Sequence, residues 1–136
     1  MATNLVITLR VLSLSAVLIT GGVDLNTAEL FLPSTGTNCT LPNLPEARRD
    51  HTVDNDILCG GFQTSDSCLQ LTPSSGSWEE LVTLDIRRYW HVSWTPGSGI
   101  GTYLMGGADS RKTSTLIRSD GTQETGFTLA LQYETM

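Results

Sequence analysis

The residues of this chain with the clearest chemical potential are three cysteines, Cys39, Cys59 and Cys68. Cys59 ends one short apolar run and Cys68 begins another, with eight residues between them. Adjacent antiparallel strands place opposed Cβ atoms about 4.5–5.5 Å apart, a separation that a disulfide can bridge after small adjustment. The spacing therefore predicts a Cys59–Cys68 disulfide, with two buried free thiols as the alternative.

That pairing leaves Cys39 as a free thiol, or as one half of a bond to a cysteine outside this sequence or in another chain. The run Asn38-Cys39-Thr40 also satisfies the N-glycosylation sequon, which makes Asn38 a candidate glycosylation site. The cysteine spacing does not match the Cys-x2-4-Cys pattern of zinc sites, and the chain has only 2 histidines. No metal site is therefore expected.

The two histidines and two of the arginines recur at one interval: His51 and His91 are 40 positions apart, as are Arg48 and Arg88. Recurrence favours a structural role, for the histidines a hydrogen bond on the innermost strand of each unit. The arginines either form a polar clamp between neighbouring units or contact a ligand. No Ser/His/Asp order, paired carboxylates, phosphate loop or zinc-helix motif is present, so we expect a non-enzymatic protein without a cofactor.

Pairs of glycines end three short apolar runs and space the chain into similar units. The intervals between pairs are 39 and 46 residues, a period typical of repeat architectures. A glycine pair at a strand end permits positive φ angles and close approach of a neighbouring backbone. The pairs are Gly21-Gly22, Gly60-Gly61 and Gly106-Gly107.

A strand followed by a turn is predicted after each glycine pair, because β-forming residues are followed by glycine-containing turns. The predicted strands are Thr27–Leu32, Cys68–Thr72 and Thr113–Arg118, and the turns end at Gly36, Gly76 and Gly121. We expect no substantial helix beyond the first 20 residues.

Over roughly residues 10–129, the glycine pairs, the turns and the Arg/His elements together resemble the kelch repeat, in which each unit is one four-stranded blade of a β-propeller. Trp78 follows the second turn where the kelch pattern places a tryptophan, whereas Asn38 and Gln123 stand at the aligned positions. The resemblance implies an all-β fold, a partial kelch-type β-propeller of four-stranded antiparallel blades. It divides the chain into repeats at 17–49 and 50–88 and an incomplete one at 89–136.

Residues 1–16 are either a degenerate signal segment or a first blade strand. Propellers have four to eight blades, so three repeats do not close a ring. We therefore expect a fragment of about three blades that needs further blades or another copy.

The net charge of −6 disfavours nucleic acid as a partner. The resemblance implies a scaffold that binds an unknown protein or glycan. The possible disulfide, the sequon and the single lysine, Lys112, favour a secreted or extracellular protein. The alternatives are a cytoplasmic substrate receptor, like the kelch adaptors of ubiquitin ligases, and a fragment of a galactose-oxidase-like enzyme.

The segments that follow the glycine pairs are the expected ligand-facing loops, since binding residues concentrate on loops carried by a rigid scaffold. They are Asp24–Asn26, Gln63–Asp66 and Asp109–Lys112. Ordinary solvated turns are the alternative. The candidate polar contacts are Asp24, Asn26, Arg48, Asp66, Arg88, Asp109 and Arg111.

Overall fold

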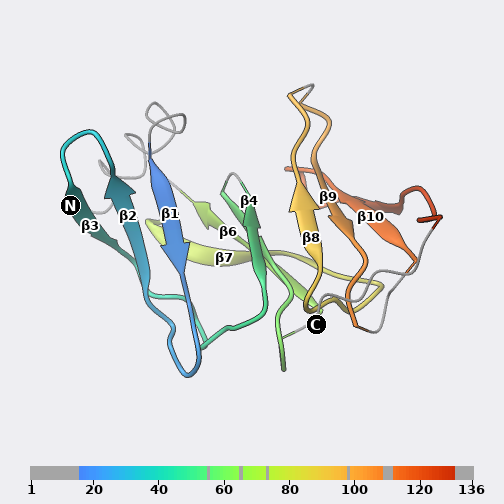
Figure 1. Cartoon of the computed structure of the whole chain (residues 1–136), viewed down its shortest axis with the longest axis horizontal. Helices are drawn as coiled ribbons and strands as arrows, with labels where there is room; N and C mark the ends of the chain where they lie inside the picture. The colour runs from blue at the N-terminus through green and yellow to red at the C-terminus, as the bar shows by residue number, and fades with distance from the viewer. Residues whose placement is uncertain are drawn as a thin grey trace. The chain divides into compact units, whose positions relative to one another are not determined.

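The structure is a computed structural model that describes residues 16–54, 56–64, 66–72, 74–97, 99–108 and 112–130. The regular secondary structure of these residues consists of β-strands, and the strands form three sheets (Figure 1). The predicted all-β fold with antiparallel blade-like sheets is thereby confirmed. Residues 1–15 lie outside the described part of the chain, and with them almost all of the possible signal segment or first blade strand.

Sheet 1 has the strand order β1-β2-β3 and both of its strand pairs are antiparallel. The strands are β1 (Val17–Thr20), β2 (Ala28–Leu32) and β3 (Thr37–Leu41). A turn joins β2 to β3, in which Gly36 has a φ of 67° and donates its N–H to the Leu32 carbonyl at 2.9 Å.

Sheets 2 and 3 each have four strands in sequence order, so that every strand pairs with its chain neighbour. Sheet 2 consists of β4 (Thr52–Asp54), β5 (Ile57–Cys59), β6 (Ser67–Thr72) and β7 (Ser77–Thr83). Sheet 3 consists of β8 (Val92–Trp94), β9 (Thr102–Met105), β10 (Ser114–Ile117) and β11 (Gln123–Thr125). The strands predicted after the glycine pairs, β2, β6 and β10, lie within one residue of their expected bounds.

The glycine pairs occupy the same place in all three sheets. The first glycine of each pair donates its N–H to the residue before the next strand or at its start, which closes each hairpin at the same point. These bonds join Gly21 to Thr27 (2.8 Å), Gly60 to Ser67 (2.9 Å) and Gly106 to Thr113 (3.0 Å). All six glycines have a positive φ, which residues with a Cβ atom rarely adopt.

Main-chain bonds of longer range also recur at equivalent positions of successive repeats. The second glycine of a pair donates to the carbonyl of the repeated arginine, from Gly22 to Arg48 at 2.7 Å and from Gly61 to Arg88 at 3.0 Å. The leucine four residues before each of these arginines donates to the loop after the glycine pair. These bonds join Leu44 to Asn26 (2.7 Å) and Leu84 to Asp66 (2.6 Å), and Leu129 bonds in the same way to Lys112 (2.7 Å).

The chain forms two compact units. The first comprises the described residues up to Arg49 together with Leu71–Glu79. In this unit Trp78 is buried and its indole N–H donates to the Pro42 carbonyl at 2.9 Å, so the tryptophan of the repeat pattern anchors the segment that follows β3.

The second unit comprises the described residues of Asp50–Gln70 and Glu80–Met136. Its core brings one face of sheet 2 against one face of sheet 3: Ile57, Cys59 and Cys68 pack with Leu104 and Ile117. The first strands of the two sheets, β4 and β8, also contact each other (Figure 1).

Candidate functional site

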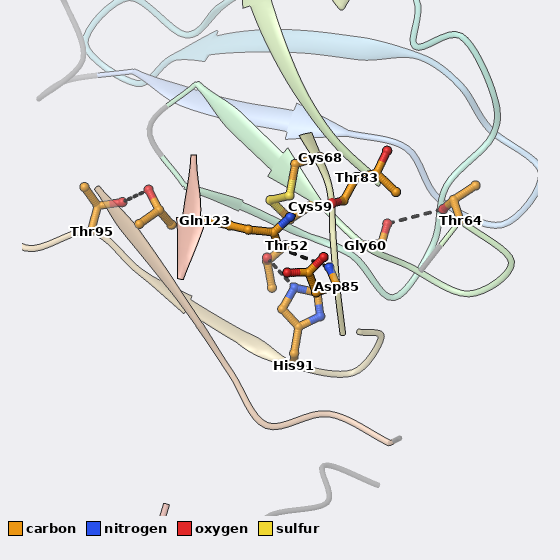
Figure 2. The surroundings of a disulfide bond; sticks show 11 residues. Thr52, Cys59, Gly60, Thr64, Cys68, Thr83, Asp85, His91, Thr95 and Gln123 are labelled. Atoms are coloured by element: carbon orange, nitrogen blue, oxygen red, sulfur yellow. Dashed lines mark hydrogen bonds between the residues drawn. A yellow bond between two sulfur atoms is a disulfide. The ribbon is translucent and has the colours of Figure 1, made fainter. Parts of the chain in front are cut away.

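The centre of the second unit is the predicted disulfide between Cys59 on β5 and Cys68 on β6 (Figure 2). The two residues are directly opposed in the antiparallel register, with their Cα atoms 4.1 Å apart, and both are buried. The prediction is confirmed, and Cys39 is a free, half-buried thiol. The disulfide fits an oxidising compartment such as the extracellular space.

Arg88 lies in the segment between sheets 2 and 3, and its side chain is fully buried. One guanidinium nitrogen donates to the carbonyls of Gly106 (2.8 Å) and Thr113 (3.1 Å), and the other donates to the hydroxyls of Thr113 (3.0 Å) and Thr115 (2.8 Å). Burial lowers the pKa of Arg88 to about 10, at which the side chain is still charged at neutral pH. Arg88 thus fixes the third glycine pair and β10 from the loop that carries it.

His91 is buried beside this arginine, and its Nε2 lies 2.8 Å from the hydroxyl of Thr52 on β4 (Figure 2). Burial first, and then the positive charge of Arg88 and the proximity of His51, lower the pKa of His91 to about 3. The imidazole is therefore neutral at physiological pH. The bond gives His91 a structural role, but it joins the segment before β8 to β4 of the preceding repeat instead of lying on a strand of its own unit.

Gly60 packs against this cluster so closely that it does not tolerate a side chain. Its φ is 68°, and a Cβ placed on it would overlap the Arg88 carbonyl and come within 2.9 Å of the His91 ring. Since Gly61 donates to the same carbonyl, the second glycine pair permits the close approach of the chain that leads into sheet 3.

The two arginines predicted as candidate ligand contacts are both buried. Arg48 is 1% exposed and Arg88 is 0% exposed, so neither guanidinium offers a surface to a ligand. Arg48 forms an ion pair with Glu46 at 2.7 Å. The expectation that these arginines contact a ligand is not supported by their burial, and the contacts of Arg88 favour the clamp alternative.

The other predicted ligand residues occupy turns with different exposure. Asp24 is exposed and has a φ of 57°. Asn26 is half-buried, because its amide donates to the Leu44 carbonyl at 3.1 Å, and Asp66 is also half-buried. Asp109 and Arg111 lie outside the described residues. Asn38 is exposed on β3, as a glycosylation site must be.

Three aromatic side chains of the second unit, Phe62, Tyr89 and Trp90, form a cluster that sequence reasoning did not find; we call it the rim cluster. Phe62 follows the second glycine pair, and its ring centroid lies 5.7 Å from that of Tyr89, edge to face. Tyr89 meets Trp90 at 5.3 Å. The N–H of Ala108, after the third glycine pair, donates to the Tyr89 carbonyl at 3.1 Å. Loops after two glycine pairs therefore meet the segment that follows Arg88.

Trp90 adopts a backbone conformation unusual for a bulky residue. Its φ is 56°, in the left-handed region that disfavours large side chains, and it is 47% exposed. The equivalent residue of the preceding repeat, Asp50, has a φ of 59°, so the repeat dictates the conformation. Aspartate tolerates this conformation well. The left-handed backbone at position 90 therefore disfavours tryptophan relative to aspartate.

The comparisons with models of known protein families and with curated proteins found no match. Among the described residues there is no helix long and apolar enough to cross a membrane. In the same part of the chain, no three His, Cys, Asp or Glu side chains are grouped so that they could hold a metal ion.

Proposed function

We propose that this chain is a non-enzymatic binding scaffold of the kelch-repeat kind, which acts outside the cell and takes a protein or glycan ligand through the rim cluster. Support for the kelch resemblance comes from the hydrogen bonds that recur at the glycine pairs and at Arg48 and Arg88. The buried Cys59–Cys68 disulfide supports an extracellular site of action.

The observation that carries the binding proposal is Trp90. A half-exposed tryptophan in left-handed conformation costs the fold free energy, and such costs concentrate at functional sites. Tryptophan and tyrosine are also the residues that contribute most at binding surfaces, because they bury large area with few rotatable bonds. The rim cluster adds Phe62 and Tyr89 beside it.

The test compares the wild-type chain with Trp90→Asn on a glycan array and on a panel of extracellular protein domains. Asparagine suits the left-handed backbone, so the free energy of unfolding should stay within about 1 kcal/mol of wild type. Binding should be lost in the variant and kept in the matched control Asp50→Asn. Equal binding by wild type and Trp90→Asn would refute the rim cluster as the ligand site. The class of probe retained by wild type distinguishes a glycan from a protein ligand.

A further inference from the structure

Four residues other than glycine have a positive φ in the described part of the chain, and they occupy two equivalent positions of the first two repeats. Asp24 and Gln63 each follow the second glycine of a pair by two residues, with φ of 57° and 72°. Asp50 and Trp90 each follow the repeated arginine by two residues, with φ of 59° and 56°. The first repeat therefore has aspartate at both positions, whereas the second repeat has glutamine and tryptophan.

Gln63 is the third residue of a turn whose backbone disfavours its side chain. The N–H of Thr64 closes this turn by donating to the Gly61 carbonyl at 3.2 Å. In the first repeat, the N–H of Leu25 donates to the Gly22 carbonyl at the same distance. A positive φ at the third position of a turn favours glycine or asparagine, and aspartate tolerates it because its side chain is short. Glutamine is longer, so backbone stability does not explain its presence here.

The turn that carries Gln63 is fixed beside the rim cluster. Gln63 is exposed and directly follows Phe62, whose ring packs against the tyrosine of the cluster. Gly61, at the start of the turn, donates its N–H to the Arg88 carbonyl at 3.0 Å, two residues before Trp90. The two positions of the second repeat that lack the favoured aspartate thus belong to one surface of the second unit. A site that is held in place before its ligand arrives loses less conformational freedom on binding.

We propose that Gln63 is the hydrogen-bonding residue of the rim cluster and that the ligand is a glycan without formal charge. This proposal rests on the proposed function of the rim cluster and adds the class of its ligand. The face of an aromatic ring is partially negative, so Trp90 attracts the weakly positive C–H groups on one side of a pyranose ring. The carboxamide of Gln63 has two N–H donors and a carbonyl acceptor, which suit the hydroxyl groups at the edge of the same sugar.

The charge of the site distinguishes a neutral glycan from the other ligand classes. Gln63 and the three side chains of the rim cluster carry no formal charge, in contrast to the two aspartates of the first repeat. An anionic glycan is bound most strongly by a cation, and the guanidinium of Arg88 is buried. An apolar side chain of a protein ligand would leave the amide of Gln63 without a partner, which lowers affinity. The residues therefore favour a neutral glycan.

The ligand class is tested with the purified chain on an array of neutral, sialylated and sulfated glycans, beside a panel of extracellular protein domains. We expect binding to neutral oligosaccharides of pyranose units, and an affinity about tenfold or more lower for Trp90→Asn. Binding of protein domains alone, lost in Trp90→Asn, would keep the rim cluster as the ligand site and overturn the glycan proposal. A preference for sialylated or sulfated glycans would also overturn it. Binding of no probe would overturn both proposals.

Gln63→Gly separates the role of the amide from that of the turn. Glycine adopts a positive φ without strain, so the midpoint of urea unfolding should stay close to that of wild type. The affinity for a neutral oligosaccharide retained on the array, measured by calorimetry, should fall about threefold to tenfold, the loss expected for one uncharged hydrogen bond. Asn43→Gly is the matched control, because Asn43 is an exposed amide residue of the first unit, and it should bind like wild type. Equal affinities of Gln63→Gly and wild type, with Trp90→Asn impaired, would overturn the assignment of Gln63 and leave the rim cluster as the ligand site.

Discussion

The buried histidine gives the fold a defined dependence on pH. His91 has a pKa of about 3 in the native state, against 6.5 for an unperturbed imidazole. Between these values the unfolded chain binds a proton that the native chain does not bind. The contribution of the neutral His91 to the free energy of unfolding is therefore full above pH 6.5. It falls as the pH is lowered, by about 1.4 kcal/mol for each pH unit well below 6.5. From pH 7.5 to pH 5 the loss assigned to His91 is about 2 kcal/mol.

The assay is urea unfolding followed by tryptophan fluorescence at pH 7.5 and pH 5.0, on wild type and on His91→Gln. Glutamine is neutral throughout and can still bond to the Thr52 hydroxyl. The carboxylates titrate alike in both proteins, so the difference between the two pH dependences isolates the histidine. We expect wild type to lose about 2 kcal/mol more than His91→Gln over this range. Equal losses, or an NMR titration of His91 with a midpoint near 6.5, would refute the assignment of a neutral buried imidazole.

Two other predictions concern the same core. Gly60→Ala should destabilise the chain by about 1–3 kcal/mol more than Gly36→Ala, measured by chemical denaturation. Both glycines have a φ near 67°, but only a Cβ at position 60 would meet other atoms. Equal losses would show that the close approach to Arg88 is not present. Replacing Cys59 and Cys68 together by alanine should lower the free energy of unfolding by roughly 2–3 kcal/mol, the chain-entropy value for a loop of this length. Peptide mapping of the non-reduced wild type should recover the two cysteines in one linked peptide. A linkage to Cys39 instead would contradict the register of β5 and β6.

The features that sequence analysis predicted well are those with a local physical cause. The glycine pairs and the turns at Gly36, Gly76 and Gly121 are needed where the backbone takes positive φ. They therefore fix where hairpins close and where strands begin. The Cys59–Cys68 disulfide was predictable for the same reason, since a short hairpin leaves few registers in which the two residues can oppose each other.

The features that sequence analysis missed depend on residues far apart in the chain. The acceptors of Arg88 lie 18 to 27 positions away, and no local pattern identifies Thr113 or Thr115 as its partners. The same distance hid the burial of the arginines, for which a ligand contact and a polar clamp were the two alternatives. The strain at Trp90 becomes visible only when its φ is set beside that of Asp50. Comparison of the Asp50 and Trp90 positions in aligned repeats was the signal that could have found it.

The repeat interpretation depends on the packing of one face of sheet 2 against the Leu104/Ile117 face of sheet 3. NOE measurements on the methyl groups of Leu104 and Ile117 test it most directly. We expect contacts from these methyl groups to the β-protons of Cys59 and Cys68, across the core of the second unit. Methyl groups without these contacts, and accessible to a soluble paramagnetic agent, would contradict it.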